Sequence, residues 1–450
     1  MSKALIKKAV LLGFVVIALL VGLRMITFIT WDRVQQRANA VESIRQSSAG
    51  PQVLSGPVFA RTCVEERKES KQVDGKTVVE THRTTRELRA FPARLTWRGD
   101  IAVEPRRRSL YTVNTYRATL TADAAWESLS ALIPSASSKD ASIACHTPRL
   151  EVILSDQRGI QSASVTMNDT ARKLVSGSGA SDAASGFSVV MSEWESFDAT
   201  TANTQKPSVQ IKLDLLGMET LAVLPMAEDT QLALGSMWPH PSFMGSFLPR
   251  EKSIAGTGFT AAWRVSSLAT NSQSNYPCTA SRNKSGQDTP CGESMAVTLV
   301  DPVNPSALSE RAVKYGELFI ALTFVGIGLF ELLRRVKVHP IQYLLIGSAL
   351  AVFFLLLLSV SEHVSFALAY ALASIGCTAL IAVYAKSVLG GWGGALPLIG
   401  GCATLYGVLY LVLQSEQHAL LAGSLLIFVV LAGVMVATRN IQWSQLNGNE

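Results

Sequence analysis

The sequence of 450 residues lacks the short motifs by which many enzyme classes are recognised. It has no G-x-x-x-x-G-K-[ST] loop to cradle a phosphate and no H-E-x-x-H pair to hold zinc. The stretch Gly179–Ala183 comes nearest to a serine-nucleophile elbow, but it lacks the second glycine and follows no strand pattern. The six histidines are scattered without ligand spacing. These absences predict a protein that is not an enzyme and that uses no cofactor and no metal ion.

Cysteine is rare, with six residues in the chain, and no two of them form a C-x-x-C pair. Two of them, Cys377 and Cys402, lie inside apolar runs. The other four lie in the polar part of the chain: Cys63, Cys145, Cys278 and Cys291. They could be free core thiols or metal ligands, but an even number in an oxidising compartment favours disulfides. We expect Cys278–Cys291, which would close a polar loop, and with it Cys63–Cys145.

Charge is scarce in five long stretches of the last third of the chain. These apolar runs are Gly316–Leu333, Ile341–Val360, Val364–Tyr384, Leu396–Leu413 and Ala419–Ala437. About 20 helical residues cross a hydrocarbon core of roughly 30 Å, and lipid offers a bare backbone amide no partner. Each run is therefore predicted to be a transmembrane helix. A sixth run lies within residues 1–30, and because no signal-peptidase site follows it we interpret it as an uncleaved anchor.

The connections between these predicted helices differ in charge according to the side that they would face. If the lysines before the anchor are cytoplasmic, the inside connections contain Arg334, then Lys386, then Arg439. The outside connections, at 361–363 and 414–418, contain neither lysine nor arginine. This pattern obeys the positive-inside rule and predicts six transmembrane helices with both termini in the cytoplasm and residues 441–450 as a tail. It also explains part of the net charge of +6, so we expect a lipid bilayer and no nucleic acid as partner.

Ionisable residues within or at the ends of the apolar runs are Arg24, Glu317 and Glu331. Intramembrane acids raise the hypothesis of proton or ion transport. In a simpler interpretation, Glu317 pairs with Lys314, and Glu331 pairs with Arg334 or Arg335, one helical turn away. Arg24 would then extend to the outer headgroups, although a pair with an acid of the bundle is also open.

The sequence between the anchor and the second apolar run is polar. Residues 31–50 keep a helical pattern that stops at Ser47–Pro51, which predicts a helical stalk. Within residues 51–315 apolar and polar residues alternate, most strictly over Ser208–Leu215, as in antiparallel strands with one buried face. The predicted fold is therefore a membrane α-helical protein with six transmembrane helices. A large β-rich periplasmic domain, residues 51–315, lies between helices 1 and 2, and residues 316–440 form a five-helix bundle.

One polar segment, Trp238–Pro249, has an unusual composition, WPHPSFMGSFLP. Three prolines and three large aromatic residues predict that it is not the interior of a regular strand. It is either a stiff surface loop for recognition or a loop packed over the core. The candidate recognition residues are Trp238, His240, Phe243 and Phe247.

Four stretches resemble the CreD family of inner-membrane cell-envelope integrity proteins. They are WPHPSFMGSFLP at 238–249, RAVKYGELFIALTF at 311–324, HPIQYLLIGSAL at 339–350 and LLLLSVSEHVSFALAY at 355–370. SIRQSSAGPQVLSGPV at 43–58 is similar to that family's junction after the first helix. The resemblance spans nearly the whole chain. It implies a location in the inner membrane of a Gram-negative bacterium and a role in envelope maintenance and the β-lactam response, and it implies no catalytic residue.

The leading hypothesis is a non-enzymatic inner-membrane protein that supports cell-envelope integrity and the envelope stress response. Its periplasmic domain would bind or scaffold an envelope protein or ligand. The alternative is a transporter or lipid-handling protein that uses the bundle around Glu317 and Glu331. A periplasmic enzyme is a third hypothesis.

Overall fold

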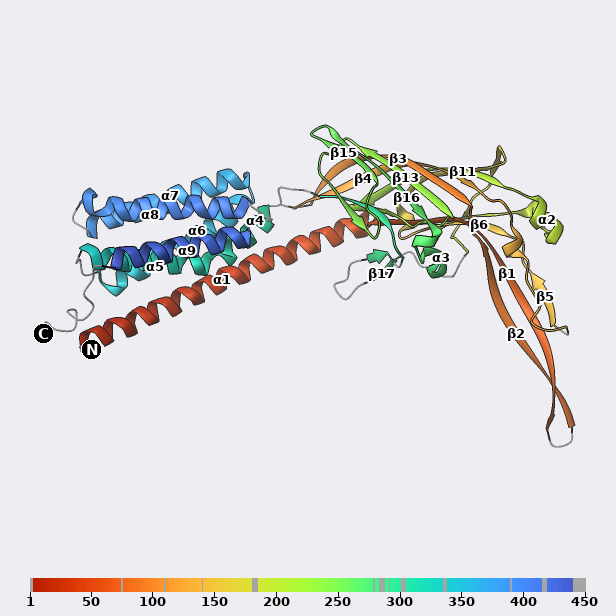
Figure 1. The fold of residues 1–450 in the computed structure, drawn as a ribbon, viewed down its shortest axis with the longest axis horizontal. Coiled ribbons are helices and arrows are strands. Elements are labelled where there is room, and N and C mark those ends of the chain that lie inside the picture. The colour runs from red at the N-terminus through yellow and green to blue at the C-terminus, as the bar shows by residue number, and fades with distance from the viewer. Residues whose placement is uncertain are drawn as a thin grey trace. The chain divides into compact units, whose positions relative to one another are not determined.

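The structure, a computed structural model, describes most of the chain. The described residues are 3–439 apart from 74–75, 109–110, 140, 180–184, 278–279, 283–287, 291, 301–304, 335–337, 389–390 and 415–418. The chain forms two compact units (Figure 1). A helical unit contains Met1–Asn39 and Val303–Glu450, and a β unit contains Ala40–Pro302.

The helix α1 (Lys3–Ser47) is continuous over 45 residues. At 1.5 Å per residue it is about 68 Å long. The predicted anchor and stalk are thus one helix. Its last helical residue is Ser47, before Gly50 and Pro51, so the predicted end of the stalk is confirmed.

Two large sheets build the β unit, as Figure 1 shows. The first has the order β14-β19-β12-β1-β6-β10-β9, with β2 and β5 also paired to β1. Its strands are β1 (Gln52–Val73), β2 (Lys76–Ala90), β5 (Ala141–Cys145), β6 (Arg149–Leu154), β9 (Val175–Ser176), β10 (Gly186–Val190), β12 (Thr220–Val223), β14 (Pro241–Gly245) and β19 (Met295–Leu299).

The second sheet has the order β15-β16-β13-β3-β4-β11-β7-β8. Its strands are β3 (Arg94–Arg108), β4 (Tyr111–Ala125), β7 (Ile160–Met167), β8 (Thr170–Arg172), β11 (Ser208–Met218), β13 (Asp229–Ser236), β15 (Glu251–Ala255) and β16 (Gly258–Ser266). The smaller elements are β17 (Ala280–Arg282), β18 (Asp288–Pro290), α2 (Ala199–Thr204), α3 (Ser272–Asn275), and the 3₁₀ turns η1 (Ser130–Leu132), η2 (Gln157–Gly159), η3 (Ser192–Trp194) and η4 (Ser267–Ala269).

The predicted alternation of side chains produces the core of the β unit. In β11, Val209, Ile211 and Leu213 are buried while the residues between them are exposed. Buried residues of both sheets, among them Phe59 and Trp97, belong to one hydrophobic cluster. The two sheets therefore enclose a common core, as stacked sheets do, and the predicted β-rich class is confirmed.

The hairpin of β1 and β2 extends beyond the rest of the β unit (Figure 1). Its base is held by β5, which pairs with β1 between Cys63 and Arg67. The disulfide Cys63–Cys145 joins the two strands there, which confirms this pair. The other expected pair, Cys278–Cys291, lies outside the described residues.

Six helices follow the β unit within the described chain. They are α4 (Pro305–Lys314), α5 (Gly316–Arg334), α6 (Pro340–Ser361), α7 (Phe366–Val388), α8 (Trp392–Gln414) and α9 (Ala419–Thr438). In the described residues four helices are long and apolar enough to cross a membrane: α1 from Val10 onward, α6, α7 and α8. Gly423–Val436, within α9, is apolar but shorter. The helix α4 belongs to the helical unit, which therefore begins before the predicted domain boundary at residue 315.

Two leucines of α1 pack into gaps left by glycine in the helical unit. A Cβ atom at Gly347 of α6 would overlap the side chain of Leu19, and one at Gly316 of α5 would lie 2.6 Å from Leu23 Cδ2. Leu19 and Leu23 are both buried. Because glycine lets helices approach closely, α1 packs as a member of the bundle.

Candidate functional site

The segment Trp238–Pro249 contains the strand β14 at one edge of the first sheet. It pairs with β19 so that Pro241 lies opposite Leu299. The prediction that the whole segment is a loop was wrong over Pro241–Gly245, which form a strand. An edge strand tolerates proline at its first residue, because only one side of the strand must supply the ladder, and the sequence alone did not reveal the edge position.

The aromatic side chains of this segment anchor it to the core. Trp238, Phe243 and Phe247 are partly buried and pack against the hydrophobic cluster of the β unit. The Phe243 ring lies edge-on to Phe259 and Trp263, with centroid distances of 5.8 and 5.7 Å. The indole Nε1 of Trp263 donates to the carbonyl of Phe247 at 3.0 Å. Contacts between aromatic rings and one hydrogen bond therefore fix the segment to the core of the β unit.

One connection supplies an edge strand to each sheet. We name residues 237–257, between β13 and β16, the edge connection; it contains β14 of the first sheet and β15 of the second. Four of its apolar side chains are exposed, with fractions of 87% for Met237, 53% for Met244, 69% for Leu248 and 50% for Ile254. His240 is exposed as well. Exposed apolar side chains at a sheet edge are a feature of binding surfaces.

The sequence analysis singled out the aromatic residues of this segment and missed the aliphatic ones. The alternation of side chains along β14 could have identified the exposed aliphatic residues, because Phe243 points to the core and its neighbour Met244 is exposed. Methionine at such a position can adapt to partners of different shape.

Glu317 forms an ion pair with Arg24 of α1, with an oxygen-to-nitrogen distance of 3.2 Å. This confirms the alternative in which Arg24 meets an acid of the bundle. A second pair joins the same helix to the end of α6, with Arg33 Nε 3.4 Å from Glu362 Oε1. Both pairs fix α1 against the other helices of its unit.

Glu331 is hydrogen-bonded to α6 and to the residue Val338 that precedes it. Its carboxylate accepts hydrogen bonds from the hydroxyl of Tyr343 at 2.9 Å and from the Val338 N–H at 3.4 Å. Tyr343 is buried. In this structure each of the two predicted intramembrane acids ties one helix to another: Glu317 ties α5 to α1, and Glu331 ties α5 to α6.

A buried cluster of charged side chains, which the sequence did not predict, lies in the first sheet of the β unit. Glu151 of β6 is fully buried and accepts hydrogen bonds from Arg149 Nε at 2.5 Å and from the Tyr276 hydroxyl at 2.7 Å. Arg149 also contacts Glu87 of β2 at 2.8 Å, and Arg89 contacts the same carboxylate at 2.6 Å. The cluster therefore fixes β2, β6 and the Tyr276 turn to one another.

Burial raises the pKa of Glu151, and the hydrogen bonds from Tyr276 and Arg149 offset part of this effect. Burial and the neighbouring Glu151 carboxylate raise the pKa of Tyr276 well above its ordinary value. Every member of the cluster has a partner within it, which is the arrangement that a structural network requires. Across the part of the chain that the structure describes, no group of three His, Cys, Asp or Glu side chains could hold a metal ion.

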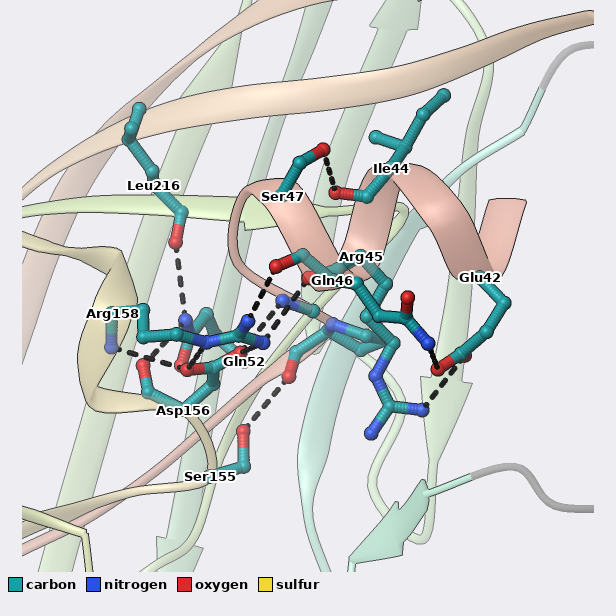
Figure 2. Close-up of polar contacts among 12 residues, drawn as sticks. Glu42, Ile44, Arg45, Gln46, Ser47, Gln52, Ser155, Asp156, Arg158 and Leu216 are labelled. Carbon is teal, nitrogen blue, oxygen red and sulfur yellow. Dashed lines mark hydrogen bonds and ion pairs between the residues drawn. The ribbon is translucent and has the colours of Figure 1, made fainter. Parts of the chain in front are cut away.

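A second polar cluster joins the end of α1 to the β unit, as Figure 2 shows. Arg158, in η2, donates from Nη1 to the Gln46 carbonyl at 3.0 Å and from Nη2 to the Arg45 carbonyl at 3.1 Å. Carbonyls in the last turn of a helix have no partner within the helix, so Arg158 caps α1. Asp156 holds this guanidinium with contacts of 2.6 and 2.9 Å and accepts the Gly50 N–H at 3.1 Å.

Gln52 and Ser155 complete this cluster, which we name the α1 joint. The buried side-chain amide of Gln52 donates to the carbonyls of Asp156 at 3.0 Å and Leu216 at 3.1 Å (Figure 2). The Ser155 hydroxyl donates to the Pro51 carbonyl at 2.8 Å. Burial alone would raise the pKa of Asp156, but the hydrogen bonds from Arg158 and from Gly50 together lower it. The joint holds the helix end to β6, η2 and β11.

A profile of the family described as inner membrane protein CreD matches residues 4–444 of the chain. The chain is also 33% identical over 435 residues to inner membrane protein CreD of Escherichia coli (strain K12), a match that covers 95% of this chain and 91% of that protein. The chain belongs to the CreD family.

Membership of the CreD family confirms the resemblance seen in the sequence and places the chain among inner membrane proteins. The four long apolar helices of the described residues agree with this location. Because the CreD match runs through both units, the edge connection and the α1 joint both lie within the region that the family shares.

Proposed function

We propose that this CreD-family chain supports cell-envelope integrity by binding a partner in the periplasm, without catalysis. The observation that carries the proposal is the edge connection. Its aromatic side chains pack onto the core while Met237, Met244, Leu248 and Ile254 are exposed. A segment that is already fixed in place loses little conformational entropy on binding, so such an edge suits docking.

The proposal requires the β unit to face the periplasm, with six transmembrane helices and both termini in the cytoplasm. Two observations support this orientation. Lysine and arginine lie in the predicted inside connections, and the disulfide Cys63–Cys145 is of a kind that persists in oxidising compartments. A reporter that is active only in the cytoplasm should be active when fused at Asn440 and silent at Asn203. The reverse pattern would contradict the orientation.

A pair of charge substitutions tests the docking role. Met244→Asp with Leu248→Asp places charge on the exposed side of the edge connection and should abolish complementation of the envelope defects of a deletion strain. The matched control is Leu268→Asp, since Leu268 is 96% exposed but lies in η4, outside the edge connection. Both variants should keep the melting temperature of the β unit. Full complementation by the double variant at normal protein levels would refute the docking role.

A transport or lipid-handling role is the second candidate, and one observation favours it. The ion pair of Arg24 and Glu317 lies in the helical unit with side chains 75% and 51% exposed, and charges in membrane segments often mark sites of function. Glu317→Gln with Glu331→Gln separates the two candidates. The docking role predicts that complementation survives, whereas the transport role predicts its loss in a chain that still folds.

A further inference from the structure

The strand β3 ends in three consecutive exposed arginines, Arg106, Arg107 and Arg108, which we name the arginine tip. Their partners across the hairpin, residues 111–113 of β4, include no acid. In the part of the chain that the structure describes, none of the three arginines has an ion-pair partner, and neither has Glu104, the nearest acid along β3. The hairpin of β3 and β4 therefore ends in a positive charge that it does not neutralise.

The arginine tip lies at the end of the β unit where the chain enters and leaves it. Val113, in the strand opposite the tip, is buried in a cluster with Ile44 near the end of α1. The next residue, Asn114, donates from Nδ2 to the carbonyl of Leu299 at 3.0 Å, close to the end of the β unit. The hairpin thus passes between the two segments that connect the β unit to membrane helices.

The hairpin also runs back along α1, toward the membrane-spanning part of that helix. Thr115 lies opposite Met218, whose N–H donates to the carbonyl of Gly50 just after the helix. Two residues nearer to the tip, Val113 packs with Ile44, within the helix. Each step toward the tip therefore lies beside an earlier residue of α1.

The distance from the hairpin to the level of the lipid headgroups is short. Val41, which packs against the same cluster, lies ten residues after Trp31, or about 15 Å along the helix. Trp31 follows the apolar run of the anchor, and tryptophan is enriched at the interface of a bilayer. Arg108 lies two residues beyond Arg106, the partner of Val113, which adds about 7 Å of strand before the long arginine side chain. The tip is therefore within reach of the headgroups.

We propose that the arginine tip binds the phosphates of anionic phospholipids in the bilayer that holds the helical unit. Guanidinium groups bind phosphate oxygens through paired hydrogen bonds. Side chains alternate along a strand, so Arg107 lies on one side of the hairpin and the other two arginines lie on the opposite side, which allows contact with several lipids. The inference goes beyond the proposed function, because binding of a periplasmic partner through the edge connection requires no contact between the β unit and lipid.

Fluorescence quenching in the full chain tests the proposal. Pro105→Cys places a dye on an exposed residue beside the tip. The chain is reconstituted in nanodiscs that contain a phospholipid with a nitroxide on its headgroup, in phosphatidylcholine alone or with phosphatidylglycerol added. Quenching should be several-fold stronger with phosphatidylglycerol and should weaken as salt is added, because salt screens charges at a surface. The chain without Pro105→Cys measures any labelling of its own cysteines.

Substitution of the arginines tests which charges make the contact. At an anionic surface one basic side chain contributes about 1 kcal/mol, so Arg107→Gln should lower the ratio of bound to free tips about fivefold. Replacing all three arginines by glutamine should reduce quenching to its level in phosphatidylcholine. The matched control is Arg94→Gln, which removes the same charge from the first residue of the same strand, about 46 Å from Arg108. It should leave quenching unchanged.

Three results would overturn the proposal. They are equal quenching in the two lipid compositions, equal effects of Arg107→Gln and Arg94→Gln, and full quenching of the triple variant. A tip that binds an acidic protein in place of lipid would give the first of these results. Arg107→Gln breaks no ion pair among the described residues, so its outcome does not depend on a folding defect. Failure here would leave the substitutions in the edge connection as a separate test of the proposed function.

Discussion

Arg158→Ala should detach the end of α1 from the β unit without unfolding the β unit. The substitution removes the two hydrogen bonds to the carbonyls of Arg45 and Gln46 and the contacts that hold Asp156. Hydrogen bonds that involve a charged group contribute about 1.5–3 kcal/mol each, but half of the Arg158 side chain is exposed, so solvent reduces this contribution. We therefore expect a total loss of about 2 kcal/mol.

Hydrogen exchange of the full-length protein in detergent measures this loss locally. A loss of about 2 kcal/mol corresponds to a roughly 30-fold fall in the protection of amides in residues 40–52, while the strands of the core keep theirs. The matched control is Arg98→Ala, which breaks a 2.9 Å pair between the exposed side chains of Arg98 and Asp123 and caps no helix. It should change stability by at most about 0.5 kcal/mol. If the two variants behaved alike, the account of the α1 joint would be refuted.

The pH dependence of the joint has a definite sign. Because the pKa of Asp156 is lowered in the folded protein, its contribution is present above the ordinary value of 3.8 and is lost as the pH falls through the folded pKa. Exchange at residues 40–52 should accelerate over this acid window in the wild type, beyond the intrinsic effect of pH. Arg158→Ala should show less of this extra acceleration.

Three further predictions concern other parts of the fold. Gly347→Leu should displace Leu19 of α1 from its place against α6 and lower the melting temperature of the helical unit, whereas an unchanged melting curve would contradict the packing. Replacing Cys63 and Cys145 by serine removes a disulfide between residues that are 82 positions apart in sequence. It should destabilise the β unit by about 4 kcal/mol in urea unfolding, and a loss below about 1 kcal/mol would count against the link. Because burial raises the pKa of Glu151, its contribution is complete below about pH 4.5 and is lost as the pH rises through the folded pKa. Relative to Glu151→Gln, the wild type should lose up to about 1.4 kcal/mol per pH unit in that window, and parallel pH profiles would contradict the assignment.

Local patterns predicted much of the fold. The alternation over Ser208–Leu215 gave β11, because the side-chain period of a strand is a property of the backbone. The end of α1 before Gly50 and Pro51 was also predicted from local sequence alone. Apolar runs likewise predicted the helices α5 to α9 of the helical unit, because long apolar runs favour helices in lipid.

Contacts between distant parts of the chain could not be predicted in the same way. Arg158 and Gln46, which meet at the α1 joint, are 112 residues apart. Arg24 meets Glu317 although the whole β unit lies between them in sequence, and Lys314 lies much nearer to that acid. The strand at Pro241–Gly245 was missed because an edge position depends on the order of strands in the sheet, which periodicity does not encode.

Photocrosslinking in living cells tests the central claim, that the edge connection binds a partner in the periplasm. A photoreactive amino acid at Met244 should give a defined adduct with an envelope component, and the same group at Val190, which is 50% exposed on β10, should give none. No adduct from Met237, Met244 or Leu248 in a protein that is folded and active, or the same adduct from Val190, would contradict the claim.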